Sequence, residues 1–389
     1  MKLLCTADFH LQTGNQEKLS TLKWLYEEAS RQEVDAFLLA GDLFDTRGDY
    51  NQLKSKVINI FDGVSADIPV LAVPGNHDNF LKNTIHLGED VHILDESNPS
   101  RMIEDRGQKV QIIGLPYLKG QLASQYIDSL HLQKSAEAHF LISHGSLIDP
   151  DHEYLQKGIE AQSENNSFLF FPEDFNGSGI AMTILGHWHG NKVIHENDLD
   201  FLYPGSPLPN SSRELGQKSY TLVQIDSTGE SRFRHNLIRS PDSWYYRKES
   251  LFVRNLKRVK PKLSKILEGN PADSRCFLIL EVEGFVPDEQ ERRIKREIQR
   301  QIHNHQEDFF DIRLKWKVGT TTALENPLIQ RYLDRAENLE PEDIDISDIL
   351  SSDESDLRER FMSLLSSDFE AVIRKIEEHG LSAFSNRLD

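Results

Sequence analysis

Apolar residues in the first 240 positions occur in short runs that alternate with longer amphipathic stretches. The runs are rich in Val, Ile, Leu and Phe, which is typical of buried strands. They predict strands at residues 2–6, 36–40, 70–73, 110–115, 138–143 and 181–185. Apolar residues at helical spacing predict helices at residues 16–31 and 50–61. Strands and helices that alternate in this way indicate an α/β fold.

The pattern changes around the polar stretch 239–243, where we place a domain boundary. Beyond it the order is strand, helix, strand, helix, strand. The strands are predicted at residues 245–253, 275–282 and 309–318, and the helices at residues 257–267 and 288–303. We therefore expect a first domain at residues 1–240 and a smaller α/β domain at residues 241–324.

Residues 325–389 form a third region of different character. Its Ser- and Asp-rich part, residues 343–356, has too few large apolar residues to build a core and is predicted to be a linker. From Leu357 to Ile376 the apolar residues fall on one helical stripe. Such a helix either packs on its own domain or docks a partner.

Composition excludes several classes of protein. Of the 389 residues, 38% are hydrophobic and 28% are charged, so the chain can build a core and is neither disordered nor collagen-like. The longest apolar runs have the length of a strand, which excludes a membrane-spanning role. Two cysteines, Cys5 and Cys276, predict neither a disulfide framework nor a cysteine zinc site, and indicate a reducing, cytoplasmic location.

The net charge of −19 is unevenly distributed. Residues 230–265 contain eleven Lys and Arg residues and three Asp and Glu residues. Residues 325–370 contain four Arg residues and fourteen Asp and Glu residues. Phosphate contacts come from Lys and Arg, so the acidic region is a poor surface for DNA. Candidate DNA contacts lie in the basic stretch: Arg232, Arg234, Arg247, Lys248, Arg254, Lys257 and Arg258. The alternative is a solvated face whose neighbouring aromatic residues pack inside the second domain.

Asp, Asn and His residues gather directly after the predicted strands. They form five blocks, Asp8-Phe9-His10, Gly41-Asp42-Leu43-Phe44-Asp45, Gly75-Asn76-His77-Asp78, Ser143-His144-Gly145 and Gly186-His187-Trp188-His189. Open α/β sheets bind ligands at the carboxyl ends of their strands, so the blocks are expected to converge on one site. A lone buried histidine is more often a core residue than a ligand, but five such blocks favour a metal site. Oxygen and imidazole donors without thiolates suit manganese, iron or zinc.

Together the five blocks resemble the signature of the calcineurin-like metallophosphoesterase superfamily. Within it, residues 4–11 (LCTADFHL), 40–45 (AGDLFD) and 203–207 (YPGSP) are similar to the SbcD-type nuclease subunits of DNA break repair. The resemblance covers roughly the first 240 residues and implies a four-layer α-β-β-α sandwich. Beyond residue 240 the chain resembles these proteins only in its layout. That layout implies an α/β capping domain, followed by a helical tail that binds an SMC-like ATPase of the SbcC type. The resemblance also implies a homodimer.

The resemblance implies a centre of two divalent metal ions, most simply Mn²⁺. It assigns Asp8, His10 and His189 to one ion, Asn76, His144 and His187 to the second, and Asp42 as the bridge between them. A carboxylate has two oxygens and can bind two cations. Paired ions ~3.5 to 4 Å apart can stabilise both the attacking and the leaving oxygen of a phosphoryl displacement and lower the pKa of a shared water.

Three further residues surround this implied centre. By resemblance, His77 contacts the scissile phosphate and helps to protonate the leaving group, which makes it the candidate catalytic residue. Asp78 either orients a neighbouring histidine or caps a turn. The role of Asp45 stays open.

Three hypotheses of function follow. The leading one is a manganese-dependent phosphodiesterase that cleaves DNA ends or hairpins, as an exonuclease or endonuclease, in an SbcC/SbcD-like repair complex. The second is a small-molecule or cyclic-nucleotide phosphoesterase, which needs the same metals but has little use for the acidic linker and terminal helix. The third is a scaffold with a vestigial site, which the presence of the full donor set argues against.

Overall fold

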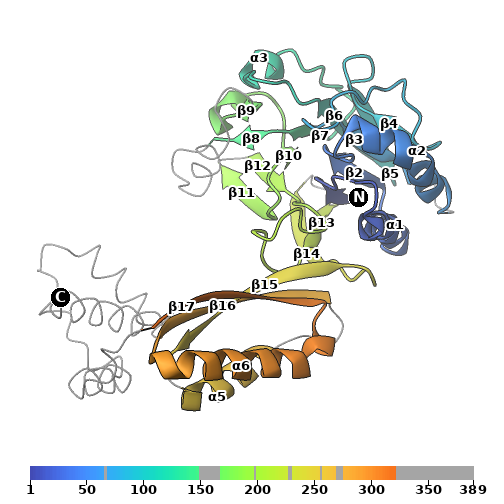
Figure 1. Ribbon diagram of the computed structural model, residues 1–389. Helices are drawn as coiled ribbons and strands as arrows, with labels where there is room; N and C mark the ends of the chain where they lie inside the picture. The colour runs from blue at the N-terminus through green and yellow to red at the C-terminus, as the bar shows by residue number, and fades with distance from the viewer. Residues whose placement is uncertain are drawn as a thin grey trace, which may run out of the picture. The chain divides into compact units, whose positions relative to one another are not determined.

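Two six-stranded sheets form the framework of the first part of the chain (Figure 1). The computed structural model describes residues 1–64, 68–148, 167–196, 199–226, 230–254, 256–268 and 275–320. The chain divides into two compact units, Met1–Tyr246 and Arg247–Asp389. The predicted acidic linker and terminal helix lie outside the described residues.

The first sheet has a parallel centre with antiparallel strands at one edge. Its spatial order is β14 (Ser231–Leu237), β13 (Ser219–Ile225), β1 (Lys2–Thr6), β2 (Ala36–Ala40), β3 (Val70–Val73) and β4 (Val91–Ile93). Strands β1 to β4 are parallel, whereas β13 pairs antiparallel with both β1 and β14. The parallel strands bring their carboxyl ends to one edge of the sheet.

The second sheet repeats this plan with an antiparallel strand at each edge. Its order is β11 (Lys192–Glu196), β12 (Leu199–Tyr203), β10 (Met182–Gly186), β7 (Ala138–His144), β6 (Gln108–Leu115) and β5 (Ser100–Asp105). The four central strands are parallel, and β11 and β5 run antiparallel to their neighbours.

Strand β1 shows why the two sheets stack. Successive side chains of a strand point to opposite faces, and here both faces are apolar. Leu3 and Cys5 belong to the core between the sheets, where Phe140 and Ile184 of the second sheet also lie. Leu4 points the other way, into the core beneath the helices. A strand buried on both faces reads as an unbroken apolar run, which is why these strands were predictable.

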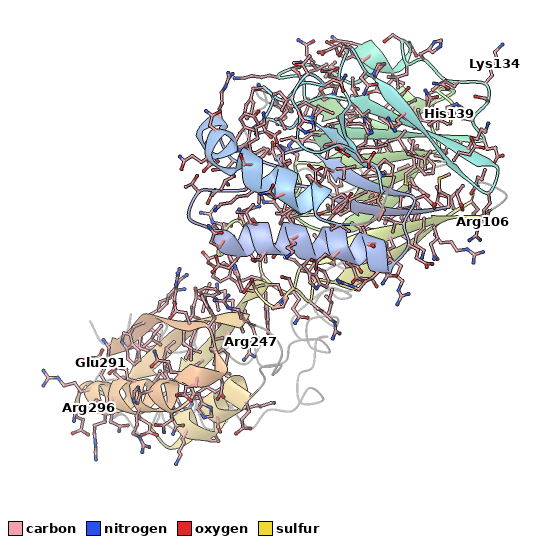
Figure 2. All side chains as sticks on the ribbon, turned by 90° about the vertical axis from the view of Figure 1, so that its right-hand side faces the viewer. Arg106, Lys134, His139, Arg247, Glu291 and Arg296 are labelled. Atoms are coloured by element: carbon pink, nitrogen blue, oxygen red, sulfur yellow. The ribbon has the colours of Figure 1, made fainter. Side chains whose placement is uncertain are left out.

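Helices α1 (Gln16–Arg31) and α2 (Arg47–Asp62) lie side by side on the outer face of the first sheet (Figure 2). Each begins at a residue whose side chain caps the helix. Asn15 accepts a hydrogen bond from the backbone N–H of Lys18 at 3.2 Å, and Thr46 accepts one from Asp49 at 3.1 Å. Both helices were expected, and α1 has the predicted bounds.

A thinner layer covers the outer face of the second sheet. It consists of α3 (Ser124–Ile127), the 3₁₀ helix η2 (Pro172–Phe175) and the small sheet of β8 (Ser146–Leu147) and β9 (Leu169–Phe170). Phe168, Phe170 and Phe175 pack there against Phe201 of β12. The order is therefore helices, sheet, sheet and a mixed helical layer, and the expected four-layer α/β fold is confirmed.

The second unit is a three-stranded sheet with two helices. Its strands are β15 (Trp244–Val253), which crosses the division between the units, β16 (Arg275–Val286) at the centre and β17 (Asp311–Thr320). Helices α5 (Leu256–Glu268) and α6 (Asp288–Asn304) cover one face of it, and η3 (Gln306–Asp308) precedes β17 (Figure 1). The predicted order of strand, helix, strand, helix, strand is confirmed.

No helix among the described residues combines the length and the apolar character needed to cross a bilayer.

Candidate metal centre

The five Asp-, Asn- and His-containing blocks meet where the carboxyl ends of the two sheets come together. Strand β7 ends at His144, and β10 ends at Gly186, immediately before His187. These strands are in register so that Gly186 lies beside His144. Across the sandwich, the ring Nδ1 of His144 hydrogen-bonds the backbone carbonyl of Ala40 at the end of β2, at 2.9 Å. The fold thus brings the blocks together at one edge, as the sequence predicts.

Backbone strain is concentrated in these blocks. Asp8, His10, Asp42 and His187 have φ angles of 54°, 45°, 52° and 90°, in the left-handed region that L side chains rarely adopt. Each such residue costs of order 1–3 kcal/mol and persists only where the surrounding structure enforces it. Four strained residues among the seven candidate ligands indicate that the loops are shaped for a function.

Two glycines let the loops approach one another closely. A Cβ atom on Gly75 would lie 2.1 Å from Oδ1 of Asp42, and one on Gly41 would lie 2.2 Å from Nδ1 of His144. Gly41 also has a φ of 88°. The absence of a side chain at both positions leaves room for the carboxylate and the ring.

One set of donor atoms gathers around Asn76. Its Oδ1 lies 2.9 Å from Nε2 of His144 and 3.1 Å from Nδ1 of His187. Oδ2 of Asp42 lies 3.3 Å from the same Nε2 of His144. Donors bound to one ion at ~2.1 Å are separated by roughly 3 Å, so these four side chains fit a divalent cation.

A second set lies beside the first. Nε2 of His10 is 3.6 Å from Oδ2 of Asp42, and Nε2 of His189 is 4.0 Å from Oδ1 of Asp8. Asp8, His10 and His189 offer three donor atoms within 4.8 Å of one another. Nε2 of His10 is buried and has no hydrogen-bond partner among the described residues, an arrangement that a bound cation would explain. Oδ2 of Asp42 therefore faces both sets.

Electrostatics at the centre depends on three histidine rings, of which those of His144 and His10 are buried. Burial would lower the pKa of His144, but the carboxylates of Asp42 and Asp8 raise it to about 9. Burial and the neighbouring His144 lower the pKa of His187 to about 3, and burial lowers the pKa of His10 to about 4. Without a cation, the raised pKa of His144 favours its protonated form, whose charge offsets that of the neighbouring Asp42 carboxylate. A metal ion must displace that proton, so its affinity should increase with pH.

Asp45 joins two of the histidines. Its Oδ1 lies 3.1 Å from Nδ1 of His10 and 3.3 Å from Nδ1 of His77. Gln12 donates from Nε2 to its Oδ2 at 2.9 Å. The ring of His77 is 42% exposed, and its backbone N–H donates to Oδ1 of Asp42 at 2.8 Å. His77 thus stands at the open side of the centre, with Nδ1 turned toward Asp45.

Asp78 has a different role. It accepts hydrogen bonds from the backbone N–H of Gly75 at 2.7 Å and of Phe44 at 3.2 Å. Burial and the charge of Asp42 raise its pKa to about 7. These contacts tie the third block to the second, and favour the turn interpretation over the histidine-orienting one.

The structure adds residues that the sequence did not reveal. Glu214 approaches His189, with Oε1 at 2.9 Å from Nδ1, and Lys218 donates to Glu214 at 2.6 Å. Burial would raise the pKa of Glu214, but the hydrogen bond from His189 and the charge of Lys218 lower it to about 2. Glu214 lies inside the loop between β12 and β13 rather than directly after a strand, so the signal that revealed the five blocks is missing here.

The candidate DNA contacts have different surroundings. Arg232 and Arg234 are exposed on β14, whereas Arg254 is only 8% exposed. Arg247 donates to the carbonyl of Ile266, and Lys248 pairs with Glu281 at 3.1 Å. The side chains of Lys257 and Arg258 lie outside the part of the chain that the structure describes.

Comparison with known proteins identifies the class. Residues 1–211 match the family model of the calcineurin-like phosphoesterases, and this match covers more than half of the chain. The chain therefore belongs to the calcineurin-like phosphoesterase family. This confirms the superfamily expected from the sequence, and the members of this family use divalent metals.

The relatives are distant. The chain is 26% identical over 217 residues to the uncharacterized metallophosphoesterase YhaO of Bacillus subtilis, covering 54% of the chain and 50% of YhaO. It is 27% identical over 288 residues to the SbcD component of the nuclease SbcCD of Escherichia coli, and this match covers 61% of the chain and 68% of that component. It is 25% identical over 248 residues to the DNA double-strand break repair protein Mre11 of Methanosarcina acetivorans, and this match covers 59% of the chain and 37% of Mre11. The chain thus spans about half the length of YhaO and less of Mre11.

We expect divalent cations to raise the melting temperature of protein that has been stripped with a chelator. A cation relieves the repulsion between the buried carboxylates of Asp8 and Asp42 and pairs with the buried Nε2 of His10. A metal at about 100 times its Kd would stabilise the fold by about 2.7 kcal/mol. Thermal unfolding would be measured with Mn²⁺, Fe²⁺ and Zn²⁺. Identical curves with and without each of them would contradict a metal centre.

Proposed function

We propose that the protein is a two-metal phosphodiesterase that hydrolyses DNA phosphodiester bonds as the nuclease component of an SbcC/SbcD-like complex. The observation that carries the proposal is the position of Oδ2 of Asp42, at 3.3 Å from Nε2 of His144 and 3.6 Å from Nε2 of His10. One carboxylate oxygen thereby serves two adjacent donor sets, with the exposed ring of His77 beside them.

In this proposal the seven donors are the ligands, and Mn²⁺ is the metal. Asp8, His10 and His189 would hold one ion, Asn76, His144 and His187 would hold the other, and Asp42 would contribute to both. When bound, such a pair of ions stabilises charge on the attacking and leaving oxygens of a phosphoryl displacement.

His77 supplies the proton chemistry. Asp45 approaches its Nδ1 from both the side-chain Oδ1, at 3.3 Å, and the backbone carbonyl, at 3.0 Å. These contacts orient the ring and leave Nε2 to face a substrate. From that position His77 contacts the scissile phosphate and protonates the departing alkoxide.

DNA is the favoured substrate because two of the relatives are described as part of a nuclease and as a DNA double-strand break repair protein. The open side of the centre also favours a large substrate, because the ring of His77 is 42% exposed and that of His189 29% exposed. Exposed Arg232 and Arg234 on β14 remain candidate phosphate contacts. Arg247 and Arg254 are the least suitable of the candidate DNA contacts. Arg247 donates to a backbone carbonyl, and Arg254 is buried.

The remaining parts of the proposal concern the rest of the chain. The second unit acts as a capping domain, and the helix predicted after residue 356 docks an SMC-like ATPase of the SbcC type. Homodimerisation is proposed from the family resemblance. The relative that is described as one component of the nuclease SbcCD supports an assembly of this kind.

The test is the cleavage of end-labelled double-stranded and hairpin DNA in Mn²⁺, Mg²⁺ or chelator. We expect shortening of the DNA that requires Mn²⁺ and is lost in Asp42→Asn. A panel of nucleotide esters and cyclic nucleotides, assayed in parallel, tests the alternative of a small-molecule phosphoesterase. Fast hydrolysis of one of these esters, with DNA left intact, would replace the proposed substrate.

A further inference from the structure

His189 is more exposed than two of the other histidines in the donor sets. Its side chain is 29% exposed, against 8% for His10 and none for His144. Burial alone therefore holds its ring less firmly than theirs. An imidazole binds a cation only through an unprotonated nitrogen, so both the ring orientation and the tautomer of His189 must be set by a neighbour.

Glu214 is that neighbour. Its Oε1 lies 2.9 Å from Nδ1 of His189. An ionised carboxylate only accepts hydrogen bonds, so the contact assigns the proton of a neutral ring to Nδ1. Nε2 then keeps its lone pair and faces Asp8, whose Oδ1 is 4.0 Å away. The opposite tautomer would place a proton where the cation binds.

The carboxylate of Glu214 is itself held from several sides. Lys218 donates to Oε2 at 2.6 Å, Ser206 donates to Oε2 at 3.2 Å, and the backbone N–H of Asn210 donates to Oε1 at 3.2 Å. Lys218 also donates to the carbonyl of His189 at 3.1 Å. One lysine thus fixes both the backbone of the histidine and the carboxylate that orients its ring.

The same segment also reaches the first block. Asn210 donates from Nδ2 to the carbonyl of Asp8 at 3.2 Å and accepts from the buried Nζ of Lys18 at 2.5 Å. Lys18 donates in addition to the carbonyl of His10 at 2.8 Å. The segment that carries Glu214 is therefore linked, directly or through Lys18, to the backbone of every ligand proposed for this ion except the bridging Asp42.

We propose that Glu214 is a positioning residue that holds His189 in the Nδ1–H tautomer and aims its Nε2 at the ion shared with Asp8 and His10. The inference rests on the proposed role of His189 as a ligand. Carboxylates that orient metal-bound histidines in this way typically contribute 10–100-fold to metal affinity or activity.

The test is Glu214→Gln, which preserves the size of the side chain and removes its charge. A glutamine can donate to Nδ1 and so favours the wrong tautomer. We expect titration calorimetry with Mn²⁺ to show about 10-fold weaker binding or more at one of two sites. In chelator-treated full-length protein at alkaline pH, ¹⁵N NMR of the histidine rings should show His189 as the Nδ1–H tautomer in the wild type and shifted toward Nε2–H in the variant.

The matched control is Glu27→Gln. Glu27 pairs with Lys23 at 3.7 Å with the same four-residue spacing, but on the exposed surface of α1. It should leave both Mn²⁺ binding and the ring signals unchanged. Lys218→Gln provides a second variant, for which we expect a smaller loss of affinity at the same site.

Wild-type Mn²⁺ affinity in Glu214→Gln, or an unchanged His189 tautomer, would overturn the inference. Neither measurement uses DNA. A wild type that binds two Mn²⁺ ions but does not cleave DNA would therefore refute the proposed substrate alone, whereas a wild type that binds none would refute the metal centre.

Discussion

Replacement of Asp42 by asparagine is expected to lower phosphodiester hydrolysis by about 10³-fold, equivalent to about 4 kcal/mol of transition-state stabilisation. Oδ2 of Asp42 lies within 3.6 Å of donors in both sets, so its loss affects both ions of the proposed pair. Asparagine keeps one oxygen, which can still accept the backbone N–H of His77, but it lacks the negative charge and the second donor oxygen. The shape of the loop is preserved while the bridge is removed.

The rate would be measured with a chromogenic phosphodiester at saturating Mn²⁺, with circular dichroism to verify the fold. Asp128→Asn is the matched control, because it removes an exposed carboxylate at the end of α3. It should retain the wild-type rate. If Asp42→Asn keeps more than about a tenth of that rate, Asp42 does not bridge two catalytic ions.

Most of the parallel strands could be predicted from the sequence because they are buried on both faces, although the interior strands β12 and β13 were not predicted. The strands at residues 2–6, 36–40 and 70–73 have the predicted bounds. The edge strands could not be found in this way. Strand β14 (Ser231–Leu237) is polar and largely exposed, and it is defined by pairing with β13 rather than by an apolar run.

The residues of the candidate site also differ in whether the local sequence pattern predicts them. The five blocks were detectable because each follows a strand of a parallel core, and the structure brings their side chains together. Glu214 is 25 positions beyond His189, and its contact with the ring depends on how the loop after β12 folds back. Nothing in local spacing distinguishes it from an ordinary surface glutamate.

In the basic stretch, a sum of charges along the sequence does not show the direction in which each side chain points. Adjacent residues of a strand point to opposite faces. On β15, Arg247 bonds the carbonyl of Ile266 in α5, whereas Lys248 pairs with Glu281 on the face of β16 that also meets Lys315 and Lys317. The charges that looked continuous in sequence are therefore divided between two faces, and several are already paired.

Gly186→Ala is expected to destabilise the protein by about 3 kcal/mol and to weaken metal binding at the same time. A Cβ atom at this position would lie 1.7 Å from the carbonyl oxygen of Ala40 and 2.6 Å from Nδ1 of His144. The first of these atoms belongs to the backbone of the facing sheet and cannot rotate away. The two sheets must shift apart, which breaks the 2.9 Å hydrogen bond between Ala40 and the ring of His144.

Chemical unfolding of metal-free protein would measure the loss of stability, and Mn²⁺ calorimetry the loss of affinity. Gly48→Ala is the control, because a Cβ there meets only Oγ1 of Thr46 at 3.5 Å, and alanine favours the first turn of α2. It should be neutral or slightly stabilising. Equal unfolding midpoints for the two variants would show that the sheets can separate without cost. The carbonyl of Ala40 that orients His144 is also the atom that excludes a side chain at residue 186, so the close approach of the two sheets at this point and the orientation of a proposed ligand depend on the same atom.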